Sequence, residues 1–328
     1  MRIVFCGTPQ FAVPSLKLLL AQSEFEIAAV ITQPDRPRGR GHEVSFSPVK
    51  EAAIAAGIPV HQPEKIRAPE VQEFLQKLAP DVIVIIAYGQ IIPARLLSIP
   101  KLGWINLHAS LLPKYRGAAP INWAIVNGET KTGVTSMRID AGMDTGEILL
   151  QKEMEIGPAE AAPELAARMS ELGARLMAQT LRGLAAGTIT PQPQAHEHAS
   201  SAPMLKREDG RIDWSRPALE IFNRIRGFAP WPGAYTSFRG QTCHIWGEPA
   251  SNDLGEQIGA AGKVALPGSL VVLQSGQKSG QKNEVLVHCG GATYLRLLSV
   301  KLEGRKQVSA VEFANGAHLL TSEHFGES

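Results

Sequence analysis

The sequence predicts an α/β fold with an N-terminal doubly wound, Rossmann-like and mostly parallel sheet, and a smaller C-terminal β-barrel domain that is OB-like. Apolar, strand-like runs alternate with segments of helical spacing through the first half of the 328 residues. A polar stretch without apolar periodicity follows at 187–202. After it, short alternating segments are separated by Gly and Pro, a pattern typical of small barrels.

The elements of the first half follow from apolar periodicity and from helix-start signals. The run DVIVIIA at 81–87 is apolar and β-branched on both faces, which is typical of a central parallel strand. Ser47 is the expected N-cap of a helix whose first position is Pro48. In chain order, strands are expected at 2–6, 26–32, 58–61, 81–87 and 133–139, and helices at 11–21, 47–56, 69–78 and 160–186.

The second half is expected to hold one short helix and several short strands. The helix spans 219–226, and the strands are expected at 241–246, 269–274, 284–288 and 293–298. The predicted domain boundaries are therefore 1–189 for the first domain, 190–206 for a linker and 207–328 for the second domain. Because ligands of doubly wound sheets bind beyond the carboxyl ends of the strands, the turns at 7–9, at 88–93 and after Trp104 should share one cleft.

Composition and charge place the chain among soluble globular enzymes, since 44% of the residues are hydrophobic and 20% are charged. The net charge of +2 predicts no broad basic surface, so any RNA contact must come from local clusters. Cys6, Cys243 and Cys289 lie far apart without a CxxC, which argues against a disulfide framework or a zinc site. No apolar run is long enough for a secretory signal or a membrane span, so a cytoplasmic location is expected.

Asn106 and His108 form the first candidate for chemistry. They are two residues apart, so on an extended chain they point to the same side. An amide beside an imidazole can donate hydrogen bonds to an oxyanion and can move a proton. From the spacing alone, a histidine held in a loop for structural reasons remains the alternative.

The segment 140–146 (DAGMDTG) is the second candidate, and it follows the expected strand at 133–139. Its glycines allow the backbone to turn tightly and to approach a ligand. Asp144 could orient a histidine, assist proton transfer or bind solvent. Taken alone, the segment is better explained as an Asp- and Gly-rich turn.

Two basic regions are candidates for nucleic-acid contact. Arginine and glycine dominate 36–41, directly after the second strand, as expected of a flexible loop that binds phosphates or of a solvated surface loop. The stretch 204–239 carries seven basic and four acidic residues with interleaved aromatic residues, which can bind RNA or pack between domains. The GxGxxG, GxxxxGK and GxSxG motifs are all missing from the sequence.

The sequence resembles the methionyl-tRNA formyltransferase family over nearly its whole length, most strongly from 1 to 150. The asparagine–histidine–aspartate set with the SLLP segment is shared by 10-formyltetrahydrofolate enzymes generally. The PDRP…GRG loop and the second domain resemble the branch that acts on tRNA. Gln10 departs from the family, where an acidic residue is common. The segments that carry the resemblance are 7–12, 33–37, 39–41, 47–50, 87–89, 106–113, 116–121, 144–146, 211–214 and 225–232.

The resemblance implies an enzyme that transfers the formyl group of 10-formyltetrahydrofolate, its co-substrate, to the amino group of methionyl-initiator tRNA for translation initiation. It implies a catalytic domain at 1–189, a barrel at 207–328 that assists tRNA binding, no metal, no membrane partner and a monomer. The implied catalytic residues are Asn106, His108 and Asp144. The implied folate-binding residues are Tyr88, Gly89, Ile91, Ile92, Ser110, Leu111, Leu112, Pro113 and Asp140, and the implied tRNA-binding residues are Arg36, Arg38, Arg40, Lys206 and Arg207.

Three alternatives remain open at this point. The first is a formyltransferase or hydrolase that uses the same folate with a small-molecule acceptor. The second is a dinucleotide-dependent dehydrogenase on a similar sheet, against which the missing glycine fingerprint counts. The third is an RNA-binding protein whose catalytic half is degenerate.

Overall fold

The computed structural model describes residues 1–38, 43–251, 266–273, 284–319 and 323–326. These residues form two compact units. Unit 1 consists of Met1–Ile121, Lys131–Ile156 and Glu164–Met204. Unit 2 consists of Asn122–Thr130, Gly157–Pro163 and Leu205–Ser328, so it includes two short segments from the first half of the chain.

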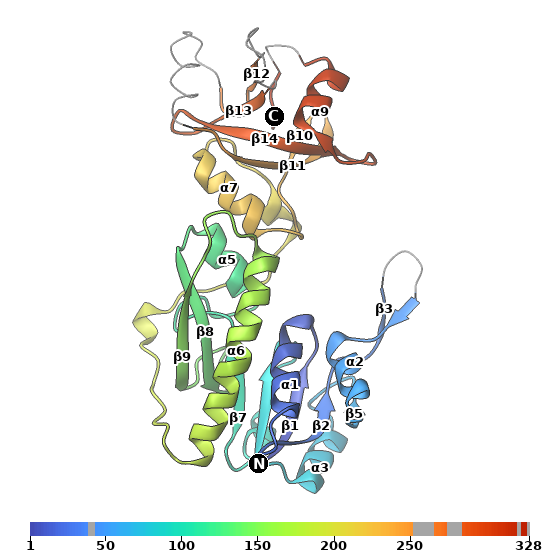
Figure 1. Ribbon diagram of the computed structural model, residues 1–328, viewed down its shortest axis with the longest axis vertical. Helices are drawn as coiled ribbons and strands as arrows, with labels where there is room; N and C mark the ends of the chain where they lie inside the picture. The colour runs from blue at the N-terminus through green and yellow to red at the C-terminus, as the bar shows by residue number, and fades with distance from the viewer. Residues whose placement is uncertain (39–42, 252–265, 274–283, 320–322, 327–328) are drawn as a thin grey trace. The chain divides into compact units, whose positions relative to one another are not determined.

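Unit 1 is built on a seven-stranded sheet in the order β5-β2-β1-β6-β7-β8-β9 (Figure 1). The chain leaves the centre at β1 in one direction through β2 and β5, and then in the other through β6 and β7, all in parallel. β8 and β9 add to the β7 edge in antiparallel orientation. The predicted doubly wound, mostly parallel sheet is therefore confirmed. The strands are β1 (Arg2–Gly7), β2 (Glu26–Ile31), β5 (Val60–His61), β6 (Val82–Ile86), β7 (Trp104–His108), β8 (Lys131–Arg138) and β9 (Ile148–Glu155).

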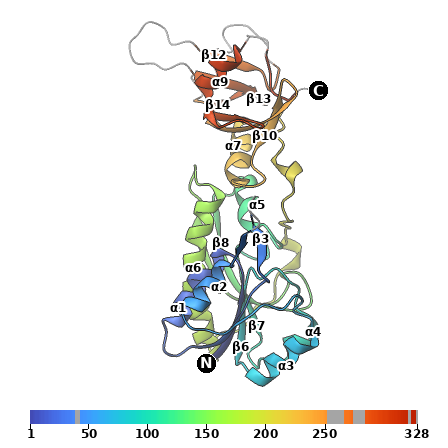
Figure 2. The same ribbon diagram turned by 90° about the vertical axis from the view of Figure 1, so that its right-hand side faces the viewer.

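Helices cover both faces of this sheet (Figure 2). On one face, Ser136 of β8 hydrogen-bonds Thr180 of α6 at 2.7 Å. On the other, the buried ring of Trp104 donates from Nε1 to the carbonyl of Leu96 in α4 at 2.8 Å. The predicted N-cap is confirmed, because the Ser47 side chain accepts from Lys50 N at 3.1 Å. The helices are α1 (Val13–Leu20, after the 3₁₀ turn Gln10–Ala12), α2 (Pro48–Ala55), α3 (Pro69–Leu78), α4 (Ala94–Leu97), α5 (Pro120–Val126) and α6 (Ala162–Ala185).

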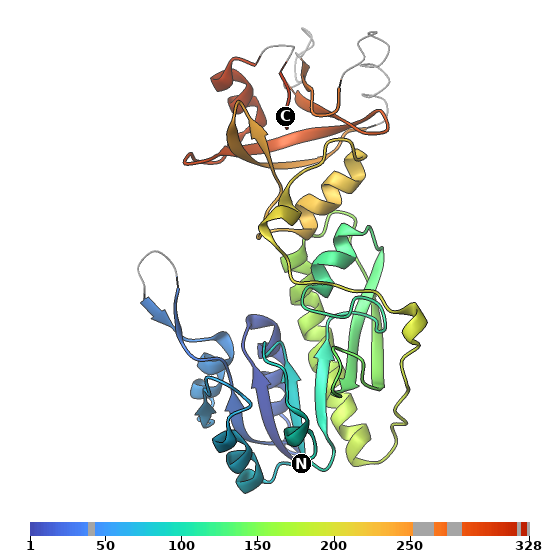
Figure 3. The same ribbon diagram turned by 180° about the vertical axis from the view of Figure 1, so that it is seen from behind.

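Two features of unit 1 lie outside the sheet and its helices. A small antiparallel hairpin, β3 (Arg36–Arg38) with β4 (Glu43–Ser45), follows β2. After α6, the chain runs along the outer side of β8 and β9 (Figure 3). There Gln192 pairs by main-chain hydrogen bonds with Ile148. The segment that reads as a linker in the sequence is thus packed on unit 1 up to Met204.

Unit 2 contains a six-stranded antiparallel sheet, in the order β10-β11-β14-β13-β12 with β15 paired to β14. Helices α7 and α9 pack on it, with Ile221, Ile225 and Phe313 in one buried cluster. This confirms a separate, smaller β domain after the α/β half. The elements are α7 (Ala218–Gly227), β10 (Tyr235–Phe238), β11 (Gln241–Pro249), β12 (Leu270–Leu273), β13 (Glu284–Cys289), β14 (Thr293–Leu302), β15 (Val308–Ser309) and α9 (Ala310–Ala317).

Helices long and apolar enough to span a bilayer are not found among the described residues.

Strand β6 lies in the core of unit 1, so truncation of its residue Ile83 to alanine is expected to destabilise the protein. Ile83 is fully buried between β1 and β7, so its truncation leaves a cavity and should lower the free energy of unfolding by about 2–5 kcal/mol. Urea denaturation of the full chain measures this loss. Ile54→Ala, at an exposed position of α2, is the matched control and should change stability by less than about 0.5 kcal/mol. Equal losses in the two variants would contradict the assignment of the core.

Candidate active site

Strand β7 ends at the candidate site and carries two of its side chains. Asn106 and His108 alternate with the core residues Ile105 and Leu107, so they share one face of the strand. His108 is only 6% exposed. Asn106 is half-buried, and its side-chain amide makes no hydrogen bond to any residue that the structure describes. The strand therefore presents, beside a buried imidazole, an amide that is without a hydrogen-bond partner among the described residues.

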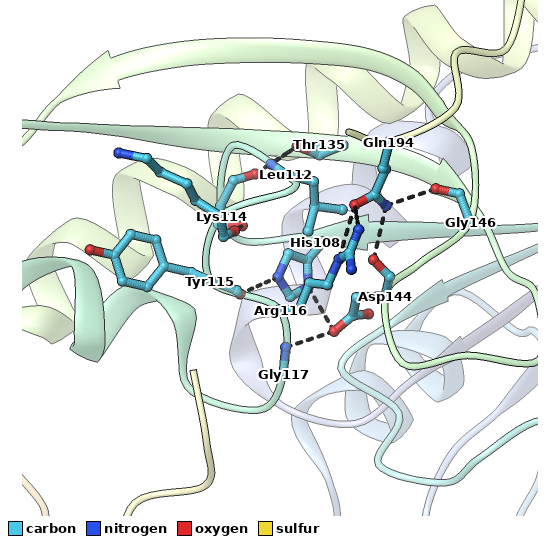
Figure 4. Close-up of polar contacts among 11 residues, drawn as sticks. His108, Leu112, Lys114, Tyr115, Arg116, Gly117, Thr135, Asp144, Gly146 and Gln194 are labelled. Atoms are coloured by element: carbon cyan, nitrogen blue, oxygen red, sulfur yellow. Dashed lines mark hydrogen bonds and ion pairs between the residues drawn. The ribbon is translucent and has the colours of Figure 1, made fainter. Parts of the chain in front are cut away.

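The imidazole of His108 lies between a backbone carbonyl and a carboxylate (Figure 4). Its Nε2 is 2.8 Å from the carbonyl oxygen of Tyr115. Because a carbonyl can only accept, this nitrogen carries the proton and donates. Its Nδ1 is 3.6 Å from Asp144 Oδ2. With protons on both nitrogens, the ring would form an ion pair with this carboxylate.

Asp144 follows β8 in a loop whose backbone is in the left-handed region at this residue, with φ of 53°. The side chain is 18% exposed. Its Oδ2 accepts from Gly117 N at 2.9 Å and also faces His108. The structure thus brings the loop after β7 and the loop after β8 together on a single carboxylate oxygen.

In the predicted folate segment 110–113, Ser110 and Leu112 are buried, and two residues that the sequence did not single out hold the segment. The Thr135 hydroxyl donates to Ser110 O at 2.6 Å and accepts from Leu112 N at 3.1 Å. Gln151 donates to Leu112 O at 2.8 Å. Ser110 itself is fully buried and donates to Lys114 O at 2.6 Å. The polar groups of this segment therefore shape the loop, and Leu111 and Pro113 are its half-buried members.

The other predicted folate residues differ in what they expose. The side chain of Tyr88 is 2% exposed, and this burial raises the pKa of its hydroxyl. Its backbone carbonyl accepts hydrogen bonds from the side chains of Gln33 and Thr8. Ile92 is also buried, whereas Ile91 is 84% exposed. Asp140 is exposed, and its carboxylate accepts from Gly142 N at 3.0 Å and Thr145 Oγ1 at 2.8 Å.

A cavity of about 800 Å³ lies beyond the carboxyl ends of β1, β2 and β6. Hydrogen bonds from Lys50 and Gln62 hold the carboxylate of Asp35 at its edge and lower its pKa. The carboxylate therefore stays charged to a lower pH than an ordinary aspartate does. The lining residues are Thr8, Gln33, Pro34, Asp35, Arg36, Ser45, Ser47, Glu64, Lys65, Ile66, Arg67, Tyr88, Gly89, Gln90 and Ile91.

The predicted tRNA-binding residues lie in both units. Arg36 begins β3, is exposed and lines the cavity. Arg38 ends β3, and Arg40 lies outside the described residues. Lys206 and Arg207 are exposed in unit 2. Arg207 begins a 3₁₀ turn at Arg207–Gly210, and Lys206 directly precedes it.

The sequence did not indicate Gln194, whose buried amide reaches the loop of Asp144 (Figure 4). It lies in the polar stretch that reads as a linker, and no spacing in the sequence relates it to Asp144. Over the described ranges, no group of three or more His, Cys, Asp or Glu residues is arranged to hold a metal ion.

Two family models match the chain. One, described as "Formyl transferase", matches residues 1–181, and the other, "Formyl transferase, C-terminal domain", matches 204–318. Among curated relatives, the methionyl-tRNA formyltransferase of Solibacter usitatus is 52% identical over 100% of this chain and 99% of its own. That of Acidobacterium capsulatum is 49% identical over 99% of this chain and 100% of its own.

The fold is shared with solved formyltransferases. A sugar 3N-formyl transferase, determined in the presence of dTDP and 5-N-formyl-THF, is similar with a TM-score of 0.63 and 19% identity. The similarity covers 93% of this chain and 99% of that one. At this level of identity the comparison bears on the fold alone.

Proposed function

Because the chain belongs to the methionyl-tRNA formyltransferase family, we propose that it transfers a formyl group from 10-formyltetrahydrofolate to the amino group of methionine on initiator tRNA. The main structural support for the proposal is the contact of His108 with Asp144. His108 shares its strand face with Asn106, whose amide has no hydrogen-bond partner in the described part of the chain. We further propose that the protein acts as a cytoplasmic monomer, without a metal, in translation initiation.

The folate supplies a formyl group on nitrogen, and the acceptor is an amine, so the reaction needs no nucleophile from the protein. Asn106 would donate its amide N–H to the formyl oxygen as negative charge develops there. Its side chain suits this role because no other described residue engages it. A donor already in place does not have to reorganise during the reaction.

His108 and Asp144 would move the protons. The attacking amine must lose a proton, and the departing nitrogen must gain one. Asp144 Oδ2, as the carboxylate, would accept the proton from the amine, and His108, with protons on both ring nitrogens, would supply the one on Nδ1 to the departing nitrogen. The carbonyl of Tyr115 fixes the orientation of the ring, and Gly117 N fixes the carboxylate. Resemblance to the family implies these roles, and the contacts of His108 and Asp144 are compatible with them.

We place the folate ring between the loop at 88–92 and the loop at 140–144. Each loop carries one strongly exposed apolar side chain, Ile91 and Met143, which a flat ring would cover. Backbone N–H and C=O groups of both loops would form hydrogen bonds with the polar edge of the ring. Because the side chains of Tyr88 and Ile92 are buried, their part in binding would be limited to the backbone.

We place the acceptor end of the tRNA at the hairpin β3–β4 and the cavity that it borders. The cavity exposes three cationic side chains, Arg36, Lys65 and Arg67, which suit a phosphate chain. The domain at 1–189 would carry the catalysis. The domain at 207–328 would assist tRNA binding, with Lys206 and Arg207 at its exposed start.

Arg36→Ala is expected to raise the KM for methionyl-tRNA about 3- to 10-fold and to leave folate binding unchanged. The variant loses one phosphate contact, so the slope of log KM against log salt should fall by about 1. Steady-state assays at several salt concentrations measure both effects. Arg175→Ala, which removes an exposed arginine from α6, is the control. An unchanged KM in Arg36→Ala would remove this residue from the tRNA site.

The proposed function is tested by incubating the full chain with formyl-labelled 10-formyltetrahydrofolate and a panel of acceptors. Label should enter charged initiator tRNA, and uncharged initiator tRNA and charged elongator tRNA should remain poor acceptors. Transfer to nucleotide sugars, to glycinamide ribonucleotide or to water instead would overturn the assignment of the acceptor. Absence of any transfer would overturn the proposed enzyme activity.

A further inference from the structure

Gln194 is a buried polar residue in an exposed part of the chain. It is 5% exposed, whereas the residues from Ala195 to Ser201 that follow it are all exposed. Its Nε2 donates to two carbonyls of the loop after β8, Asp144 O at 2.9 Å and Gly146 O at 2.8 Å. Both hydrogens of the amide are therefore used on the loop that carries the catalytic carboxylate.

The same side chain also contacts the loop after β7. Its Oε1 accepts from Arg116 at Nε (3.1 Å) and at a terminal nitrogen (2.6 Å). Arg116 lies between Tyr115, whose carbonyl accepts from His108, and Gly117, whose N–H donates to Asp144. Gln194 thus bridges, through side-chain contacts, the two loops that meet at the catalytic carboxylate (Figure 4).

Main-chain pairing holds the segment that carries Gln194 in place. Arg116 N donates to Ser200 O at 2.8 Å, and Ala202 N donates to Arg116 O at 2.7 Å. The Ser200 hydroxyl accepts from Tyr115 N at 2.9 Å. Together with the main-chain pairing of Gln192 and Ile148, these contacts hold the chain on both sides of Gln194, as precise positioning of a neighbour requires.

We propose that Gln194 is a positioning residue for formyl transfer. By holding the carbonyls of Asp144 and Gly146, it keeps Asp144 in its left-handed backbone conformation, with Oδ2 on His108 and Gly117. This conformation is uncommon for residues other than glycine, so it needs support from its surroundings. The inference rests on the proposed function, because it assigns a role in that same reaction.

Gln194→Ala should lower kcat about 10- to 100-fold, since a small displacement of a catalytic group can cost that much, and should leave both KM values within about 2-fold. Gln194→Glu should lower kcat to a similar extent, because the glutamate retains an acceptor for Arg116 but lacks the two N–H groups of the amide. Gln192→Ala is the matched control: the exposed side chain of Gln192 donates to Thr190 O and not to the loop of Asp144, so this variant should keep the wild-type kcat. A wild-type kcat in Gln194→Glu would overturn the proposal.

A double-mutant cycle separates positioning from a merely structural role. In an Asp144→Asn background, Gln194→Ala should lower the single-turnover rate by less than about 2-fold, because the group through which Gln194 acts is already lost. A further loss equal to that in the wild-type background would overturn the proposal. If Gln194→Ala does not fold, Gln194→Glu is used in the same cycle.

The same assays distinguish a failure of the proposed function from a failure of the role assigned to Gln194. If the wild-type chain does not formylate methionyl-tRNA, the proposed function fails. If the wild type is active and the Gln194 variants match Gln192→Ala, only the assignment of Gln194 fails.

Discussion

Asp144→Asn is expected to lower kcat for formyl transfer by about 10²- to 10⁴-fold, the usual contribution of general acid–base catalysis. The asparagine retains a side-chain oxygen for Gly117 N, and asparagine tolerates the left-handed backbone of this position. The loop should therefore keep its shape. What is lost is the carboxylate that would take the proton of the attacking amine and pair with His108.

Single-turnover rates, thermal unfolding and folate binding together isolate this effect. The melting temperature and the folate Kd of Asp144→Asn should match those of the wild type. Asp81→Asn is the matched control, because Asp81 lies at the opposite end of the sheet, just before β6, where it pairs with Lys101. A rate for Asp144→Asn within 3-fold of the wild type would exclude Asp144 from proton transfer.

Asn106→Ala should lower kcat by about 10²- to 10³-fold, as does the loss of one oxyanion donor in other enzymes. The KM values should change much less, because the negative charge on the formyl oxygen develops only on the way to the transition state. Steady-state kinetics on the folded variant separate kcat from KM. Asn106→Asp, which has nearly the same shape but places a carboxylate there, should be at least as slow.

The matched control for this second prediction is Asn315→Ala, an exposed asparagine in helix α9 of unit 2. Its turnover should equal that of the wild type. Near-normal turnover in Asn106→Ala would reject the oxyanion role. A large rise in KM with kcat unchanged would instead assign Asn106 to substrate binding.

Much of the fold could be predicted because strong local patterns decide it. The helix expected at 69–78 forms as α3 with those bounds, and the strand expected at 81–87 forms as β6. The helix has apolar residues at helical spacing and a proline at its first position, and the strand is a run of β-branched residues. Asn106, His108 and Asp144 could be singled out because side chains on alternating positions of a strand, and an aspartate after the next strand, are visible in the sequence.

Other features depend on contacts that no local pattern encodes. Strand β9 ends in the polar run QKEME at the edge of the sheet and has a weak apolar signal. The partner of His108 Nε2 is a backbone carbonyl, which any residue at 115 would supply. Gln194 reaches Asp144 across 50 residues from a stretch that reads as a linker. Thr135 and Gln151 hold the loop at 110–112 through hydrogen bonds that follow only from the pairing of β8 with β9.

The most direct test of the central claim is the first turnover, measured with enzyme in excess over formyl-labelled folate and charged initiator tRNA. The wild type should place the label on the amino group of methionine. Asn106→Ala and Asp144→Asn should bind both substrates as the wild type does and transfer the label at least about 100-fold more slowly. Equal rates for the three proteins would show that the amide and the carboxylate are bystanders, and the account of the site would be wrong.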